Sequence, residues 1–91
     1  MNKSHKILIV DDEKRICSSL TGIFEDEGYK VRAVQDGQAA LQEIERQVPD
    51  LMLLDLQMPE LNGYQVLERL RADAALRDIP VIVLSASDDT S

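Results

Sequence analysis

The sequence predicts an α/β fold in which a parallel sheet is covered by helices on both faces. Short apolar runs at residues 7–10, 51–54 and 81–84 are typical of strands buried within a sheet. Between the runs lie segments whose apolar residues recur at helical spacing. This alternation favours parallel strands joined by right-handed helical crossovers. The predicted element order is β-α-β-α-β-α-β.

The composition is that of one globular domain. The chain has 91 residues, of which 44% are hydrophobic and 30% charged. Its net charge of −7 argues against a nucleic-acid-binding or membrane-surface role for these residues. The single cysteine, Cys17, cannot form an internal disulfide, and no apolar run approaches the roughly 20 residues of a membrane span. We therefore expect a cytoplasmic location, with no membrane contact and no direct nucleic-acid contact.

The first half of the chain predicts a strand, a helix and a second strand. The strand at residues 7–10 is followed by a helix over residues 13–27, which Gly28 ends. Cys17 is expected to be a small buried residue of that helix. Residues 30–34 alternate polar and apolar side chains, which suits a strand with one exposed side or an edge position.

The second half continues the alternation. Asp36 is a plausible N-cap of a second helix, which Pro49 ends. Strands are predicted at residues 50–54 and 79–84, with a connector at residues 74–78 before the last strand. A third helix runs to about residue 73, and its expected apolar face consists of Tyr64, Val66, Leu67 and Leu70.

Polar side chains follow three of the predicted strands where each one ends. Asp11 and Asp12 follow the first strand, Asp55 the third and Ser85 the fourth. Because the carboxyl ends of parallel strands share one edge of the sheet, these side chains are expected to meet there. Carboxylates at close range repel one another, and a hard divalent cation such as Mg²⁺ relieves the repulsion.

Each of these residues also has a purely structural interpretation. Asp12 could cap the first helix, because acids favour helix N-termini. Asp55 could be an ordinary turn residue, and Ser85 an ordinary loop serine. Their placement at matching strand ends favours the shared site.

The combined motifs make the chain similar to the receiver domain of two-component response regulators. The resemblance covers nearly the whole chain and implies a flavodoxin-like sheet with strand order 2-1-3-4-5. It rests on Asp11-Asp12 after ILIV, on the D-x-x-M-P-x-x-x-G pattern, and on Ser85-Ala86 after VIVL. In this chain the D-x-x-M-P-x-x-x-G pattern consists of Asp55, Met58, Pro59 and Gly63.

The resemblance implies a role for each acid. Asp55 matches the residue that accepts a phosphoryl group from a sensor histidine kinase or a phosphotransfer protein, and it is also expected to be a metal ligand. Asp12 matches the direct Mg²⁺ ligand, and Asp11 the acid that holds the ion through water. Gln57 matches the position that offers its backbone carbonyl to the metal. Such a domain catalyses at most its own phosphorylation and is not a turnover enzyme.

The resemblance also implies roles for the residues around the acids. Ser85 matches the switch hydroxyl that bonds a phosphoryl oxygen, and Ala86 the small residue that leaves room for the phosphoryl group. Met58, Pro59 and Gly63 match the loop that directs Asp55 into the crevice. Gly63 would allow either a positive φ or close packing at the start of the third helix.

The resemblance ends before the family's pattern does. Receiver domains continue with a fourth helix, a fifth strand that ends in a functional lysine, and a fifth helix. Residues 1–91 are therefore expected to form one receiver domain that is incomplete at its C-terminus, with sheet order 2-1-3-4. The fourth strand would then be an exposed apolar edge, which could pair with a second copy.

Two other functions remain open. The chain could be a structural or dimerisation module without competent signalling. It could also be a metal-dependent phosphatase on a similar sheet, but such enzymes usually carry a second acid two residues after the nucleophile. Gln57 occupies that position here, which argues against this class.

Overall fold

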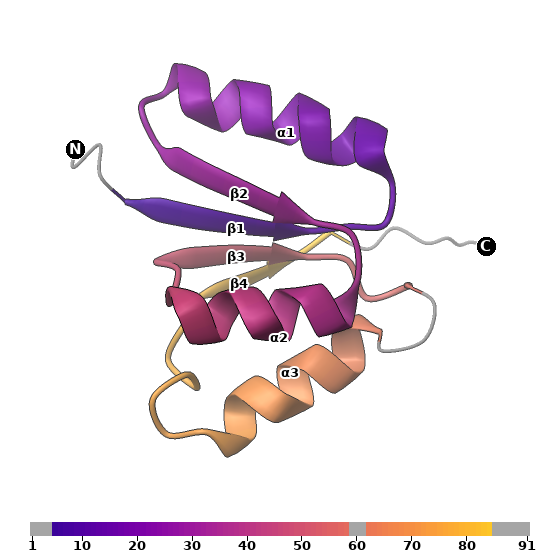
Figure 1. Cartoon of the computed structure of the whole chain (residues 1–91), viewed down its shortest axis with the longest axis vertical. Helices are drawn as coiled ribbons and strands as arrows, with labels where there is room; N and C mark the ends of the chain where they lie inside the picture. Colours follow the sequence, from indigo (N-terminus) through magenta and orange to yellow (C-terminus); the bar gives the residue numbers. More distant parts are fainter. Residues whose placement is uncertain (1–4, 59–61, 85–91) are drawn as a thin grey trace.

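The computed structural model describes residues 5–58 and 62–84 and confirms the predicted alternation (Figure 1). Within these residues, four strands and three helices follow one another in chain order. They are β1 (Lys6–Val10), α1 (Lys14–Asp26), β2 (Lys30–Val34), α2 (Gly37–Arg46), β3 (Leu51–Leu54), α3 (Gly63–Ala72) and β4 (Val81–Val83).

The strands form one parallel sheet with the order β2-β1-β3-β4, as predicted. Helix α1 covers one face, and α2 and α3 cover the other (Figure 1). β1 and β3 are the two inner strands, and Ile9 of β1 is aligned with Leu53 of β3. This arrangement brings the ends of β1 and β3 together at the carboxyl edge of the sheet.

The two faces of the sheet have separate apolar cores. On the side of α2 and α3, the buried core residues are Leu8, Val10, Ala40, Ile44, Met52, Leu54, Met58, Val66 and Leu70. On the side of α1 they are Ile7, Ile9, Cys17 and Leu53. Alternate residues of β1 and β3 therefore enter opposite cores, as the period of a strand requires.

Local signals account for where the helices begin and end. The Asp36 side chain accepts a hydrogen bond of 2.7 Å from the Ala39 N–H, which confirms its role as N-cap of α2. Asn62 and Gln65 form a reciprocal capping box at the start of α3. Gly28 has a φ of 97°, a left-handed conformation that glycine adopts without steric cost, and it follows the end of α1 as predicted.

Two predictions from the apolar pattern were wrong in detail. Tyr64 is 64% exposed, so the buried face of α3 consists of Gly63, Val66 and Leu70 without it. Leu67 is partly buried against the same core. Strand β4 is also shorter than residues 79–84. The Ile79 N–H bonds back to the Leu76 carbonyl within the preceding turn, and Pro80 has no N–H to donate to the sheet.

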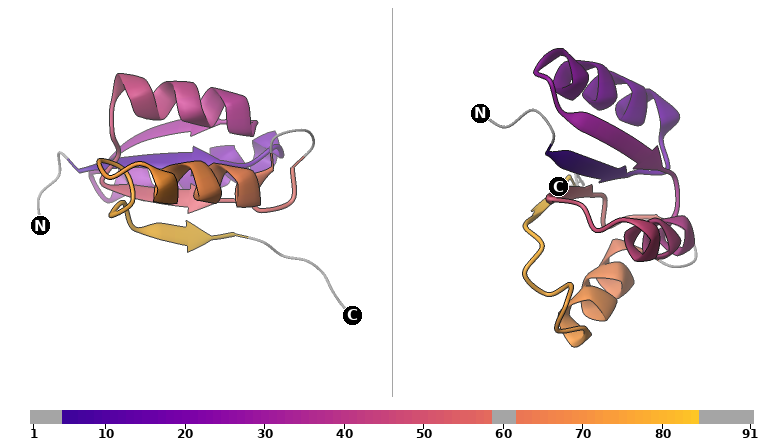
Figure 2. Two further views of the ribbon diagram at one scale, coloured as in Figure 1. Left: turned by 90° about the horizontal axis from the view of Figure 1, so that it is seen from below. Right: turned by 60° about the vertical axis from the view of Figure 1, so that its left-hand side comes forward.

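The edge positions are as predicted. β2 lies at one edge and β4 at the other (Figure 2). Ile82 and Val83 of β4 are 53% and 46% exposed, so this edge is apolar. No helix within residues 5–58 and 62–84 combines the length and the apolar character that crossing a membrane requires.

Candidate functional site

Three carboxylates meet at the carboxyl edge of the sheet. Asp11 and Asp12 follow β1, and Asp55 follows β3. One ligand oxygen from each lies within 4.8 Å of the others, and we refer to Asp11, Asp12 and Asp55 as the carboxylate cluster. The cluster opens into a hollow of about 390 Å³, whose other lining residues are Glu13, Ile16, Gln57 and Leu84.

The sheet holds the main chain of the two strand-end acids. The Asp11 N–H donates to the Val34 carbonyl of β2 at 3.1 Å, and the Asp55 N–H donates to the Val10 carbonyl of β1 at 2.9 Å. Asp55 therefore continues the pairing of β3 with β1 by one residue. The positions of these acids follow from strand pairing and not from loop conformation.

A turn of the same kind orients each of these side chains. Oδ1 of Asp11 accepts a hydrogen bond of 2.9 Å from the Glu13 N–H. Oδ1 of Asp55 accepts one of the same length from the Gln57 N–H. Aspartate commonly bonds the backbone two residues onward in this way. Sequence reasoning missed this role of the Glu13 N–H, although the spacing was visible in the chain.

The members of the carboxylate cluster differ in burial. Asp11 is 3% exposed, Asp12 is exposed and Asp55 is half-buried. Burial raises the pKa of Asp11, and the charges of Asp55 and Asp12 raise it further, against the hydrogen bond from Glu13 that lowers it. Ionised Asp11 is thus held at a cost in free energy, which a bound cation would offset.

The carboxylate cluster suits a small, hard cation. Ligand oxygens lie about 2.1 Å from Mg²⁺, so two ligands of one ion are at most roughly 4.2 Å apart. The spread of 4.8 Å is slightly larger, which fits an ion that some of the acids hold directly and others through water. The all-oxygen donor set excludes the softer sites that sulfur and imidazole form.

Close packing at Gly63 brings α3 against the strand end that carries Asp55. A β-carbon on Gly63 would lie 2.6 Å from Cα of Leu56 and 3.0 Å from the carbonyl carbon of Asp55, with the Asp55 carbonyl oxygen nearer still. Of the two alternatives for Gly63, close packing is confirmed. Within the described residues, positive φ belongs to Gly28 instead.

The structure covers only part of the predicted site. It brings together Asp11, Asp12, Asp55 and Gln57, whereas Pro59, Ser85 and Ala86 lie outside the described residues. Met58 is 7% exposed and belongs to the core on the side of α2 and α3. The apolar lining residues Ile16 and Leu84 were missed, because nothing in their local pattern distinguishes a lining residue from a core residue.

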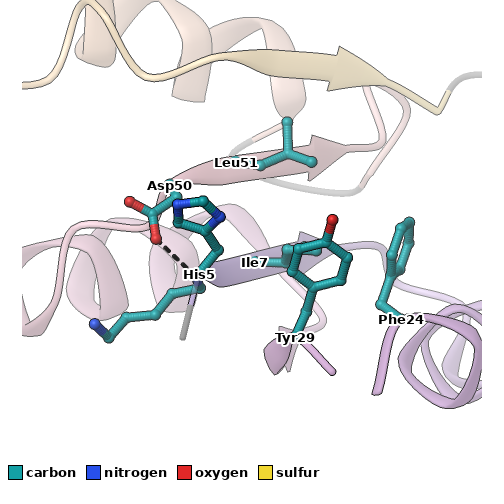
Figure 3. Close-up of a pocket in the computed structure, with 7 residues that line it drawn as sticks. His5, Ile7, Phe24, Tyr29, Asp50 and Leu51 are labelled. Atoms are coloured by element: carbon teal, nitrogen blue, oxygen red, sulfur yellow. Dashed lines mark hydrogen bonds between the residues drawn. The ribbon is translucent and has the colours of Figure 1, made fainter. Parts of the chain in front are cut away.

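A second hollow of about 420 Å³ lies at the opposite edge of the sheet (Figure 3). Phe24 and Tyr29 form part of its wall, with ring centroids 6.2 Å apart. Its one carboxylate, that of Asp50, accepts a 2.7 Å hydrogen bond from the Lys6 N–H (Figure 3). A single acid beside an aromatic wall offers a divalent cation fewer charged oxygen ligands than the carboxylate cluster does.

Known proteins share both the sequence and the fold. The family model described as response regulator receiver domain matches residues 7–91. The DNA-binding response regulator MtrA of Mycolicibacterium smegmatis is 39% identical over 85 residues, which cover 93% of this chain and 36% of that protein. The alkaline phosphatase synthesis transcriptional regulatory protein PhoP of Bacillus subtilis is 40% identical over 89 residues, covering 98% of this chain and 35% of that protein.

Solved structures of receiver domains share the fold of this chain. The N-terminal domain of a response regulator receiver protein from Methanoculleus marisnigri superposes with a TM-score of 0.87 at 37% identity, covering 94% of this chain and 70% of that one. The receiver domain of a signal transduction histidine kinase from Syntrophus aciditrophicus superposes with a TM-score of 0.88 at 36% identity. The match covers 94% of this chain and 65% of that one. The chain spans about a third of the length of the two curated relatives. On the match over residues 7–91 and these similarities, the chain belongs to the response regulator receiver domain family.

Proposed function

We propose that the chain is a phosphoacceptor that takes a phosphoryl group onto Asp55 from a phosphohistidine of a sensor histidine kinase or a phosphotransfer protein. The observation that carries this proposal is the convergence of Asp11, Asp12 and Asp55 within 4.8 Å at the carboxyl edge of a receiver-domain sheet. Phosphoryl transfer depends mostly on positioning and charge neutralisation. The strand ends position Asp55, and a cation held by the carboxylate cluster would supply the neutralisation.

The transfer forms one bond and breaks one. Oδ1 of Asp55 is engaged by the Gln57 N–H, so we assign the attack on phosphorus to Oδ2. A P–O bond forms to give an acyl phosphate, and the P–N bond to the donor histidine breaks. Its electron pair stays on the imidazole, which carries a proton on its other nitrogen and leaves neutral. A carboxylate oxygen attacks without losing a proton, so this nucleophile needs no general base.

The neighbouring residues have supporting roles. Asp12 directly, Asp11 through water and Gln57 through its carbonyl would hold Mg²⁺. When bound, that ion neutralises charge on the phosphoryl oxygens. In the same proposal the Ser85 hydroxyl bonds the transferred group and Ala86 leaves space for it, so that phosphorylation biases two conformations of this end of the domain. One phosphoryl group is held per Asp55, without turnover of a substrate.

Labelling with a small phosphodonor tests the proposal. With acetyl phosphate and Mg²⁺, intact-mass spectrometry should show one added phosphoryl group, which chelation of the metal and the variant Asp55→Asn each abolish. Asp78→Asn removes an exposed acid from a turn outside the site and serves as the matched control. Labelling that persists in Asp55→Asn, or that needs no metal, would contradict the proposed site.

The apolar edge at β4 favours a second candidate, a homodimer formed through this strand. Ile82 and Val83 are about half exposed, and β4 contains no charged residue that would discourage pairing. Pairing of two β4 edges would bury these side chains and satisfy backbone groups at the edge. Such a dimer could act as a structural module whether or not Asp55 is phosphorylated.

Sedimentation equilibrium distinguishes the dimer from a monomer. We expect Ile82→Lys to dissociate the dimer and Asp55→Asn to leave it intact. Ile23→Lys places the same charge on a similarly exposed isoleucine of α1 and should also leave the dimer intact. A wild-type chain that sediments as a folded monomer would rule this candidate out.

A further inference from the structure

We propose that Cys17, oriented by Gln35, is a positioning residue for Asp11 and so sets the affinity of the carboxylate cluster for Mg²⁺. The inference rests on the proposed metal-binding role of Asp11. It assigns a function to the one cysteine of the chain, which sequence reasoning treated as a small buried helix residue.

Cys17 contacts the main chain of Asp11 directly. Its Sγ donates a hydrogen bond of 3.3 Å to the Asp11 carbonyl oxygen, and both residues are almost fully buried, with 4% and 3% exposure. The Asp11 N–H meanwhile donates to the Val34 carbonyl of β2. The sheet therefore holds the backbone N–H of Asp11, and α1 holds its backbone carbonyl.

Gln35 gives the thiol its direction. The Gln35 side-chain amide donates to the Cys17 sulfur at 3.8 Å, so the sulfur acts as acceptor on that side and its own proton points elsewhere. The Asp11 carbonyl at 3.3 Å is a nearer acceptor than the Val34 carbonyl at 4.0 Å. A chain of hydrogen bonds thus runs from the end of β2, through α1, to the end of β1.

This series of hydrogen bonds holds the Asp11 carbonyl, which the turn at Asp11 does not engage. The Asp11 carboxylate is bonded by the N–H of Glu13, the N-cap of α1, whose carbonyl accepts from the Ile16 and Cys17 N–H groups. The Cys17 thiol adds a second tie between that turn and α1, through the Asp11 carbonyl. Since outer hydrogen bonds orient metal ligands and tune their affinity, loss of the thiol should loosen Asp11 relative to Asp12 and Asp55.

Mg²⁺ titration by isothermal calorimetry tests the inference below the unfolding temperature of every variant. Cys17→Ala removes the donor and should weaken Mg²⁺ binding roughly tenfold, the low end of what outer partners of metal ligands contribute. Cys17→Ser keeps a donor and should restore most of the affinity. Ile44→Val trims the opposite core, away from the carboxylate cluster, and should leave the affinity unchanged.

The outcomes separate this inference from the proposed function. If wild type binds Mg²⁺ and Cys17→Ala binds it equally well, or if Cys17→Ser is as weak as Cys17→Ala, the positioning role is wrong while the metal site stands. If wild type binds no Mg²⁺, the metal role of Asp11 fails and the inference fails with it. Should Cys17→Ala not fold, Gln35→Ala keeps the thiol and should show a smaller loss of affinity, and an unchanged affinity would overturn the inference.

Discussion

Replacing Gly63 with alanine would press a methyl group into the main chain that carries Asp55. Gly63 is the first residue of α3 and is buried against the end of β3. The new β-carbon would lie 2.6 Å from Cα of Leu56. It would meet backbone atoms, which cannot rotate aside as the tip of a long side chain can.

The size of the effect follows from that distance. Carbon atoms in contact stay about 3.5 Å apart, so α3 and the strand end must separate by roughly 0.9 Å from the 2.6 Å contact. Overpacking of this kind costs about 1–3 kcal/mol. For a domain of this size, a loss of about 2 kcal/mol lowers Tm by about 8–16 °C. A displacement of Asp55 by about 1 Å would also slow its phosphorylation by roughly a hundredfold.

Thermal unfolding followed by circular dichroism, together with the rate of labelling by acetyl phosphate, measures both effects. Gly22→Ala is the matched control, because Gly22 is an exposed glycine within α1 with no atom in reach of an added β-carbon. That control should gain about 0.5–1 kcal/mol from better helix propensity. If Gly63→Ala melts and labels like wild type, the close approach of α3 to Asp55 does not constrain the site.

Three further predictions concern stability. Asp36→Ala removes the N-cap bond to Ala39 and should cost about 1 kcal/mol in urea unfolding, and an unchanged midpoint would contradict the capping role. Asp11→Asn should raise Tm at neutral pH without Mg²⁺. The raised pKa of Asp11 means that its ionised form costs stability above the folded pKa, and this cost disappears as pH falls below the ordinary pKa of aspartate in the unfolded chain. The gain in Tm should therefore vanish at acidic pH, and an equal gain in Tm at neutral and at acidic pH would refute the electrostatic cause. Ile44→Ala should cost about 2–5 kcal/mol, because Ile44 is 1% exposed, and a loss below about 1 kcal/mol would show that this core collapses around the gap.

Much of the fold could be predicted because its signals are local. The apolar runs, the Asp36 cap and the glycine after α1 each depend on a few neighbouring residues. The meeting of Asp11 and Asp55 was also predictable, since parallel strands must end at one edge of the sheet. The alternation of polar and apolar residues at 30–34 indicated a strand with one exposed side or an edge position, and β2 lies at an edge.

Other features depend on how the elements pack. Tyr64 and Ile23 have the apolar character of core residues, yet they are 64% and 57% exposed. In α1 the smaller Cys17 takes the buried position instead. Helical spacing shows that a helix has an apolar face, but the neighbours across the sheet decide which of several apolar residues lies at its centre.

The sequence by itself determined the order of the elements, the parallel sheet and the identity of the acids at its carboxyl edge, because these depend on periodicity, caps and chain order. Only the tertiary structure decided that Asp11 is buried while the adjacent Asp12 is exposed, that Gly63 abuts the backbone of Asp55, and that the Cys17 thiol reaches the Asp11 carbonyl. Each of these contacts joins residues of different elements or depends on which side of a strand end is covered. They are consequences of packing between distant segments, and no local pattern records them.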